Sequence, residues 1–183
     1  REDVVAAVRG DPGEFADRHR ALHRRCGLDA ALRRRVRETS PETVDGDRIV
    51  ADYDGRSERE RRLAWRLWTL DTAPLGLTLA GPAYADNPIR YATRTLREVT
   101  GYALANLVGG NPRLLQGPAT ERGPVADLRA AVASWNETTV EVTNHRADGT
   151  PFRNRVTLAP LSGADGTVTH WLGVQERVDE PSE

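Results

Sequence analysis

The chain has 183 residues, which is enough for one domain of ordinary size with a tail but not for two large domains. Its formal net charge of -1 creates no global field that would favour nucleic acid or a membrane surface. With 38% hydrophobic and 29% charged residues, the composition is that of a water-facing protein. No stretch approaches the roughly 20 apolar residues of a membrane helix, and the charged first residues do not resemble a signal peptide, so we expect a cytoplasmic protein. Because residue 1 is Arg and not Met, we expect a fragment of a longer chain.

The N-terminal part, residues 1–57, is predicted to be an arginine-rich helical extension. Residues 14–38 favour a helix with a break near Gly27, and an acidic run follows it. The basic helix and the acidic run can pair with each other, since charge runs are usually solvated faces. A DNA-binding helix-turn-helix is the alternative, but no wing or dimer geometry supports it, so nucleic acid is not an expected partner. The single cysteine, Cys26, excludes an intrachain disulfide and a metal site built from cysteines.

Residues 58–73 are predicted to form a flanking amphipathic helix. Leu63, Leu67 and Leu70 stand at i, i+4 and i+7, with Trp65 and Trp68 close to the same stripe. Pro74 ends the helix, because proline disfavours a helical conformation in the residue before it. Such an apolar stripe requires a partner surface.

The remaining core, residues 74–179, is predicted to be an α+β domain. Short strands at 77–80 and 89–91 flank a turn, helical pieces follow over 93–115, and a longer helix is predicted over 123–134. Three long strands follow, which we place at 137–146, 151–161 and 167–178. The sequences Asp148-Gly149 and Asp165-Gly166 between these strands are typical of hairpin turns. Two strands, several helices and three strands predict a five-stranded antiparallel sheet with helices packed on one face.

One nine-residue motif carries a family resemblance. Residues 110–118 read G-N-P-R-L-L-Q-G-P, which resembles the light-oxygen-voltage signature G-x-N-C-R-F-L-Q-G with Pro112 where the family has cysteine. Residues 86–89 (D-N-P-I), 100–102 (T-G-Y) and 173–175 (G-V-Q) also resemble that family, in the same order and spacing. The resemblance covers residues 75–178. It implies a flavin-binding blue-light sensor of the PAS superfamily.

The resemblance also implies a cofactor site. Asn144, Asn154 and Gln175 would read the edge of the flavin ring, because carboxamides both donate and accept hydrogen bonds. Arg113 and Arg129 would hold the ribityl phosphate. Since no loop is inserted between these arginines, FMN is expected rather than FAD. The resemblance places six further residues at the cofactor: Asn87, Asn111, Leu115, Gln116, Val156 and Leu158. Without a ligand, the amides would cap turns or bond one another, the arginines would form surface ion pairs, and the leucines would be ordinary core residues.

Pro112 changes the chemistry that the family implies. Proline has no nucleophile, so it cannot form the covalent bond to excited flavin that the family's cysteine forms, although the first turn of a helix tolerates it. Electron transfer from a nearby aromatic residue to give the neutral flavin semiquinone remains. The candidate donors are Trp171, Tyr91, Tyr102 and Trp135. Residues 171, 173 and 175 share one face of the last strand, which favours Trp171, although a core or dimer-interface role explains it equally well.

We therefore expect a non-enzymatic sensory domain in which light reduces FMN and Gln175 relays the change to the flanking helices. No general base or substrate motif accompanies the flavin residues. A homodimer through the sheet face and the flanking helix is expected, with a downstream effector domain or protein. Two alternatives stay open, namely a flavin domain that senses cellular reductants independently of light and a structural dimerisation domain that binds no flavin.

Overall fold

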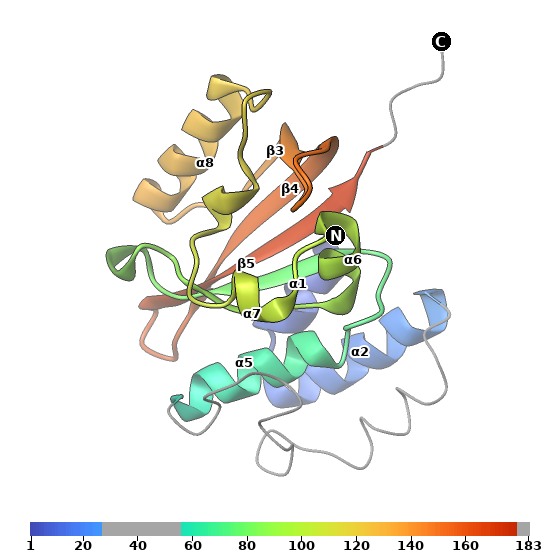
Figure 1. Cartoon of the computed structure of the whole chain (residues 1–183). Coiled ribbons are helices and arrows are strands. Elements are labelled where there is room, and N and C mark those ends of the chain that lie inside the picture. The colour runs from blue at the N-terminus through green and yellow to red at the C-terminus, as the bar shows by residue number, and fades with distance from the viewer. Residues whose placement is uncertain (27–55, 179–183) are drawn as a thin grey trace.

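The computed structural model describes residues 1–26 and 56–178 (Figure 1). The second half of the predicted arginine-rich helix and the acidic run after it lie outside the described residues. The core is one five-stranded antiparallel sheet with the strand order β2-β1-β5-β4-β3. The predicted α+β architecture with an N-terminal helical extension is confirmed. No helix in the described parts of the chain is long and apolar enough to cross a membrane.

The strands lie close to their predicted positions. The first two are β1 (Gly76–Ala80) and β2 (Ile89–Ala92), and the last three are β3 (Thr138–His145), β4 (Pro151–Ser162) and β5 (Val168–Arg177). Both predicted hairpins form. Gly149 (φ 84°) and Gly166 (φ 81°) take the positive φ values that these tight turns require.

Between β2 and β3 the chain forms the helices of one sheet face. These are α6 (Arg94–Thr100), α7 (Leu104–Leu107) and α8 (Arg122–Ser134), with the short 3-10 turns η2 (Ala83–Ala85) before β2 and η3 (Pro112–Leu115) before α8. Helix α8 begins one residue before its predicted start. It contacts β3 and stands on the side of the sheet opposite α5 (Figure 1).

The other sheet face is covered by α1 (Glu2–Arg9) and α5 (Glu58–Trp68) of the same chain. A further helix, α2 (Pro12–Cys26), packs against both of them. The predicted stripe of Leu63, Leu67 and Leu70 is buried, and Trp65 and Trp68 pack beside it. It shares one core cluster with four residues of β1 and β5: Leu77, Leu79, Leu172 and Val174. The stripe thus has its partner within the chain, and the outer face of the sheet is not open to a second copy while these helices stay docked.

Helix α1 lies within the predicted helical extension, but a helix was predicted there only over residues 14–38. Val4 and Val8 are four residues apart, and both are buried. An arginine of α5 fixes the end of this short helix. Arg66 Nη1 donates to the carbonyl oxygens of Val8 (2.7 Å) and Gly10 (2.6 Å), and its guanidinium lies 4.9 Å from the centroid of the Phe15 ring. Carbonyls at a helix end lack partners within the helix, so Arg66 binds α1 to α5.

Two buried histidines lie where α2 meets the end of α5. Their Nε2 atoms are 2.9 Å apart, and His19 Nε2 is 3.4 Å from the carbonyl oxygen of Thr69. Burial, together with the neighbouring His23, lowers the pKa of His19 from 6.5 to about 4. This buried position therefore disfavours a positive charge on the His19 imidazole.

Candidate ligand-binding cavity

A cavity of about 390 Å³ lies between helix α8, the 3-10 turns and the inner face of the sheet. This volume is in the range of small-molecule and cofactor sites, roughly 300–1,000 Å³. Its walls combine an apolar side from α8 with polar residues from the loops and from β5. It is lined by Thr78, Ala83, Asp86, Asn87, Asn111, Pro112, Arg113, Gln116, Val125, Leu128, Arg129, Val132, Ala133, Trp135, Val156, Leu158, Trp171 and Gln175.

Most of the residues that the sequence singled out meet at this one cavity. Those at its wall are Asn87, Asn111, Pro112, Arg113, Gln116, Arg129, Val156, Leu158, Trp171 and Gln175. They come from separate parts of the chain, which the sheet and its crossing loops bring together. Asn144, Asn154 and Leu115 are buried but do not line the cavity.

The three predicted amides form one buried chain of hydrogen bonds. Asn154 Nδ2 donates to Asn144 Oδ1 (2.8 Å) and to Gln175 Oε1 (2.9 Å). Only Gln175 reaches the wall, so Asn144 and Asn154 stand behind it. Asn154 Oδ1 is buried with no hydrogen-bond partner in the described parts of the chain. Since buried polar atoms are nearly always paired, this cluster has hydrogen-bonding capacity that the described residues do not use.

The loop after β1 is tightly folded at the cavity. Asp86 and Asn87 have positive φ values of 65° and 48°, a conformation that Asp and Asn tolerate better than most residues. The Asn87 side chain donates to Gly81 O (3.2 Å), and the Asn111 side chain donates to Asp86 O (2.6 Å). Two loops that are distant in the sequence are thereby joined at the wall.

Asp86 is a cavity residue that the sequence analysis did not assign. Its carboxylate forms a two-pronged ion pair with Arg113, in which Nη1 donates to Oδ1 (2.9 Å) and Nη2 to Oδ2. Both side chains are exposed to solvent at the cavity. An anion that binds Arg113 must therefore compete with Asp86 or share the guanidinium with it.

Pro112 lies at the cavity wall and opens the 3-10 turn η3. The side chain of Asn111 caps this turn by accepting a hydrogen bond from Arg113 N (2.8 Å). At the first position of such a turn no backbone N–H is required, so proline fits there without the loss of a bond. Pro112 thus presents only a saturated hydrocarbon ring to the cavity and offers no hydrogen-bonding group there.

Two tryptophans at the wall form a stacked pair. The ring centroids of Trp135 and Trp171 are 6.0 Å apart, and the ring planes are inclined by 16°. Trp171 is 1% exposed, whereas Trp135, which ends α8 with a positive φ of 57°, is 46% exposed. Trp171 Nε1 is buried and has no hydrogen-bond partner within the part of the chain that the structure describes. The pair joins the cavity wall to the protein surface.

Glycine at position 173 of β5 leaves room for the Thr78 side chain on the neighbouring strand β1. A Cβ atom there would lie 2.4 Å from Thr78 Oγ1, across the pairing of Thr78 with Gly173. Since no real side chain tolerates that contact, Gly173 allows β1 and β5 to pair while Thr78 faces the cavity.

Two of the candidate electron donors lie elsewhere. Tyr91 belongs to the core cluster on the outer face of the sheet, and its hydroxyl donates to Asp71 Oδ1 (2.7 Å). Burial and the Asp71 carboxylate raise the pKa of Tyr91 well above 10. Tyr102 packs against a small cluster formed by Ile89, Leu96 and neighbouring residues, and it does not line the cavity. Neither of these candidate electron donors lines the cavity, whereas the candidates Trp171 and Trp135 both do.

No group of three or more metal-ligating side chains occurs among the described residues. The polar side chains at the cavity wall are amides, guanidinium groups, indoles, the Asp86 carboxylate and the Thr78 hydroxyl. Amides suit a ring edge that both donates and accepts hydrogen bonds, and guanidinium groups suit phosphate.

Comparisons with known proteins agree with this geometry. The chain is 36% identical over 152 residues to a bacterioopsin transcriptional activator of Halobacterium salinarum, covering 82% of this chain and 22% of that protein. It is 42% identical over 134 residues to a blue-light-activated histidine kinase of Rhizobium johnstonii, covering 73% of this chain and 38% of the kinase. The chain thus spans well under half the length of these relatives. No protein-family model matches it.

Solved structures similar to this chain are also light-oxygen-voltage domains. One, reported as a light-oxygen-voltage domain studied with a flavin analogue, is 40% identical with a TM-score of 0.58, covering 61% of this chain and 82% of that one. The light-oxygen-voltage domain of the Erythrobacter litoralis EL346 blue-light-activated histidine kinase is 34% identical with a TM-score of 0.55. The match covers 58% of this chain and 98% of that domain.

Proposed function

The chain belongs to the light-oxygen-voltage domain family of the PAS superfamily, and on that premise we propose that it is a blue-light sensor which binds FMN and responds by one-electron photoreduction. The observation that carries this proposal is the cavity wall, which contains both Pro112 and the buried Trp171. We propose that Pro112 stands at the position of the family's reactive cysteine. A bound flavin supplies a ring that absorbs blue light and becomes a strong one-electron oxidant when excited.

The residues at the cavity fit a flavin. Trp171 Nε1 is a buried donor at the wall without a hydrogen-bond partner among the described residues, and the acceptor Asn154 Oδ1, also without one, lies behind Gln175. Gln175 uses its oxygen to accept from Asn154, which leaves its NH₂ group for a ligand acceptor. Arg113 and Arg129 would hold the phosphate. FMN rather than FAD remains the proposal because the chain between these arginines carries no insertion.

Trp171 is the proposed immediate electron donor. It is almost completely buried at the wall, and its stacked partner Trp135 reaches solvent. An electron that leaves Trp171 can be replaced through Trp135 by a reductant in solution, such as ascorbate. Pro112 takes no part in the electron transfer, because it has neither a thiol nor a π-system.

Gln175 is the proposed relay of the signal. Gln175 can present either its NH₂ group or its oxygen to a bound ring, so it would rotate if its ligand partner changed from an acceptor to a donor. Its NH₂ would then meet the NH₂ of Asn154, so Asn154 and Asn144 must rotate as well. A mismatch left in this buried chain would cost about 1–3 kcal/mol, enough to bias a two-state element.

The partners of the domain are proposals that follow from its relatives. Relatives named as histidine kinases and as a transcriptional activator favour an effector domain that receives the signal. A homodimer also remains proposed. Since α1 and α5 cover the sheet face, a second copy would meet these helices rather than the sheet itself.

The test is an absorption spectrum of the purified chain before and after blue light, with mass analysis of the released cofactor. We expect FMN and reversible reduction without covalent bleaching, whereas Pro112→Cys should bleach the flavin band through thiol addition. Covalent bleaching of the unmodified protein would contradict the assignment of Pro112. FAD in the released cofactor would contradict FMN, and a colourless protein that takes up no flavin would favour a structural module. Reduction by cellular reductants but not by light would favour the redox sensor.

A further inference from the structure

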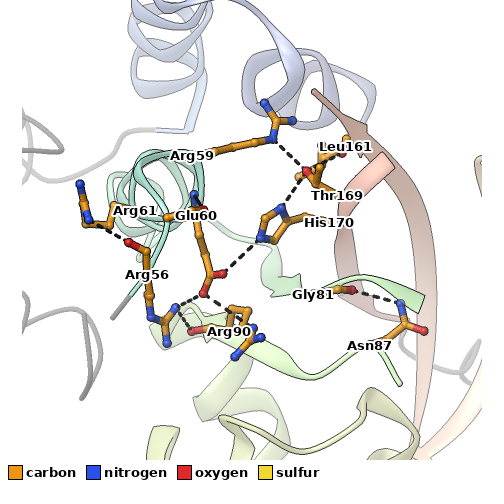
Figure 2. A network of polar contacts seen from close by, with 11 residues as sticks. Arg56, Arg59, Glu60, Arg61, Gly81, Asn87, Arg90, Leu161, Thr169 and His170 are labelled. Atoms are coloured by element: carbon orange, nitrogen blue, oxygen red, sulfur yellow. Dashed lines mark hydrogen bonds and ion pairs between the residues drawn. The ribbon is translucent and has the colours of Figure 1, made fainter. Parts of the chain in front are cut away.

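A buried ionic network joins helix α5 to the sheet on the face opposite the cavity (Figure 2). At its centre, the carboxylate of Glu60 lies 3.0 Å from Arg56 Nη1, 3.7 Å from Arg90 Nε and 3.4 Å from His170 Nε2. Glu60 is 9% exposed and His170 is 6% exposed. Burial opposes the charge of Glu60, but the hydrogen bond from His170 and the charges of Arg56 and Arg90 outweigh burial and lower the pKa of Glu60. Glu60 is therefore a carboxylate at neutral pH.

A second line of contacts orients the imidazole. Arg59 Nε donates to Thr169 Oγ1 (2.9 Å), and Thr169 Oγ1 lies 3.0 Å from His170 Nδ1. With the imidazole proton on Nε2, Arg59 donates to Thr169 and His170 donates to Glu60. The Thr169 hydroxyl can then donate to His170 Nδ1 (3.0 Å) in place of its longer contact with Leu161 O (3.4 Å). Two neighbouring residues of α5 thus bind two neighbouring residues of β5: Arg59 binds Thr169, and Glu60 binds His170.

The network reaches the two strands that lie on either side of β1. Arg90 belongs to β2 and His170 to β5, and the strand order is β2-β1-β5. Figure 2 shows Glu60 extending from α5 between Arg90 and His170. The Glu60 carboxylate therefore connects β2 and β5, the two neighbours of β1.

Cavity residues lie in β5 and directly before β2. Asn87 lies just before β2, and Trp171 follows His170 directly. Because side chains alternate along a strand, His170 faces α5 while Trp171 faces the cavity. A shift of β5 caused at the cavity would change the distance between His170 and Glu60 on the opposite face.

We propose that Glu60 and His170 form a clamp that positions α5 on the sheet and passes the state of the cavity to this helix. This inference rests on the proposed function, since it concerns how the signal of that site leaves the domain. Glu60 and His170 are positioning residues, because neither lines the cavity. When Gln175 and β5 rearrange, the clamp loosens and α5 opens more often.

The experiment measures amide hydrogen exchange of α5 in the full chain loaded with FMN, oxidised in the dark and reduced by dithionite. In the unmodified protein, reduction should raise exchange of residues 58–68 several-fold. Glu60→Gln should give fast α5 exchange already in the oxidised state and abolish the difference. Glu58→Gln is the matched control, since Glu58 pairs with Arg62 at the exposed side of the same helix and should keep the difference.

Chemical reduction separates this proposal from the photosensory one. If blue light fails to reduce the flavin but dithionite still changes α5 exchange only when Glu60 is present, the photosensory function is lost and the clamp stands. If Glu60→Gln exchanges like the unmodified protein, or exchanges faster yet keeps the redox difference, the clamp proposal is overturned. A chain that takes up no flavin overturns both proposals.

Thr169→Val is a second variant that tests the proposal even if Glu60→Gln does not fold. It removes the hydroxyl between Arg59 and His170, keeps a branched side chain of similar size, and leaves Glu60 in place. We expect a smaller redox difference in α5 exchange, with unchanged circular dichroism and FMN content. A folded Thr169→Val protein with the full redox difference would contradict the role of the oriented imidazole.

Discussion

The two faces of strand β5 are both buried, but they are completed in different ways. On the cavity face, Trp171 Nε1 and, behind Gln175, Asn154 Oδ1 have no hydrogen-bond partner among the described residues. On the outer face, His170 is matched by Glu60, and Leu172 shares a core cluster with Leu67 of α5. Buried atoms without hydrogen bonds among the described residues also occur on the outer face, at Glu60 Oε1 and Arg90 Nε. There, however, ion pairs and apolar contacts with α5 close the face, whereas the cavity face borders an open volume. The proposed ligand wall and the packing against α5 therefore lie on opposite faces of the same strand.

The largest effect should come from the apolar part of the outer face. Leu67→Ala empties a fully buried position between α5 and the sheet and should lower the free energy of unfolding by about 2–5 kcal/mol. Leu128→Ala, on the cavity wall, should cost less stability in the flavin-free protein and weaken flavin binding instead. Urea unfolding and FMN titration of both variants measure this, and equal losses of stability would contradict the division between the faces.

Acid should weaken the helical cover on the outer face. His19 titrates near 4 in the folded protein and near 6.5 when unfolded, so the unfolded state binds more protons between these values. The stability is complete above about pH 6.5 and falls as the pH drops toward 4, by roughly 3 kcal/mol at most. His19→Gln should flatten the pH dependence of urea unfolding in this window. An unchanged slope would assign the effect to other groups.

Charge at the cavity should decide which flavin binds. Arg113→Ala removes a charge-assisted phosphate contact and leaves the Asp86 carboxylate without its partner, so FMN affinity should fall about 10–100-fold. Riboflavin, which has no phosphate, should bind almost as before. The control is Arg94→Ala, which removes an exposed arginine of α6 away from the cavity wall. Equal losses for FMN and riboflavin would exclude Arg113 as a phosphate ligand.

The smallest effect should be kinetic. Trp171→Phe keeps an aromatic ring on the wall but is harder to oxidise, so photoreduction should slow several-fold while FMN stays bound. Trp135→Phe should slow it less, and Trp68→Phe, on α5, should not slow it. Transient absorption after a blue flash provides the rates. If Trp171→Phe reacts as fast as the unmodified protein, the electron has another source.

The strands were predictable from local signals. Hairpin dipeptides mark both turns between β3 and β5, and the three long strands begin and end within one residue of their predicted bounds. Helix α1 was not placed separately within the predicted helical extension because eight residues carry too little periodicity, although Val4 and Val8 are the signal that would have placed it. Tyr91 was assigned to the site from its chemistry alone, while its pairing with Leu79 places it on the outer face.

The site was predictable where the resemblance named residues and less so where loops decide the contacts. Asp86 and Arg113 are separated by 27 positions, and only the folded loops bring them together. Asn144 pairs directly with Phe152, so its bond to Asn154 is diagonal, which spacing alone does not reveal. The clamp of Glu60 and His170 joins residues 110 positions apart, and its members are common residue types with no motif.

The alternation along β5 also bears on how this strand can evolve. Adding or deleting one residue within it would place the imidazole of His170 in the cavity and the indole of Trp171 beneath α5, and every later side chain would change sides with them. Length changes should therefore be tolerated at the hairpin tip around residues 163–166, where glycine and exposed residues form the turn. Inside the strand, substitutions can be accepted one at a time, but insertions and deletions would disrupt both faces together.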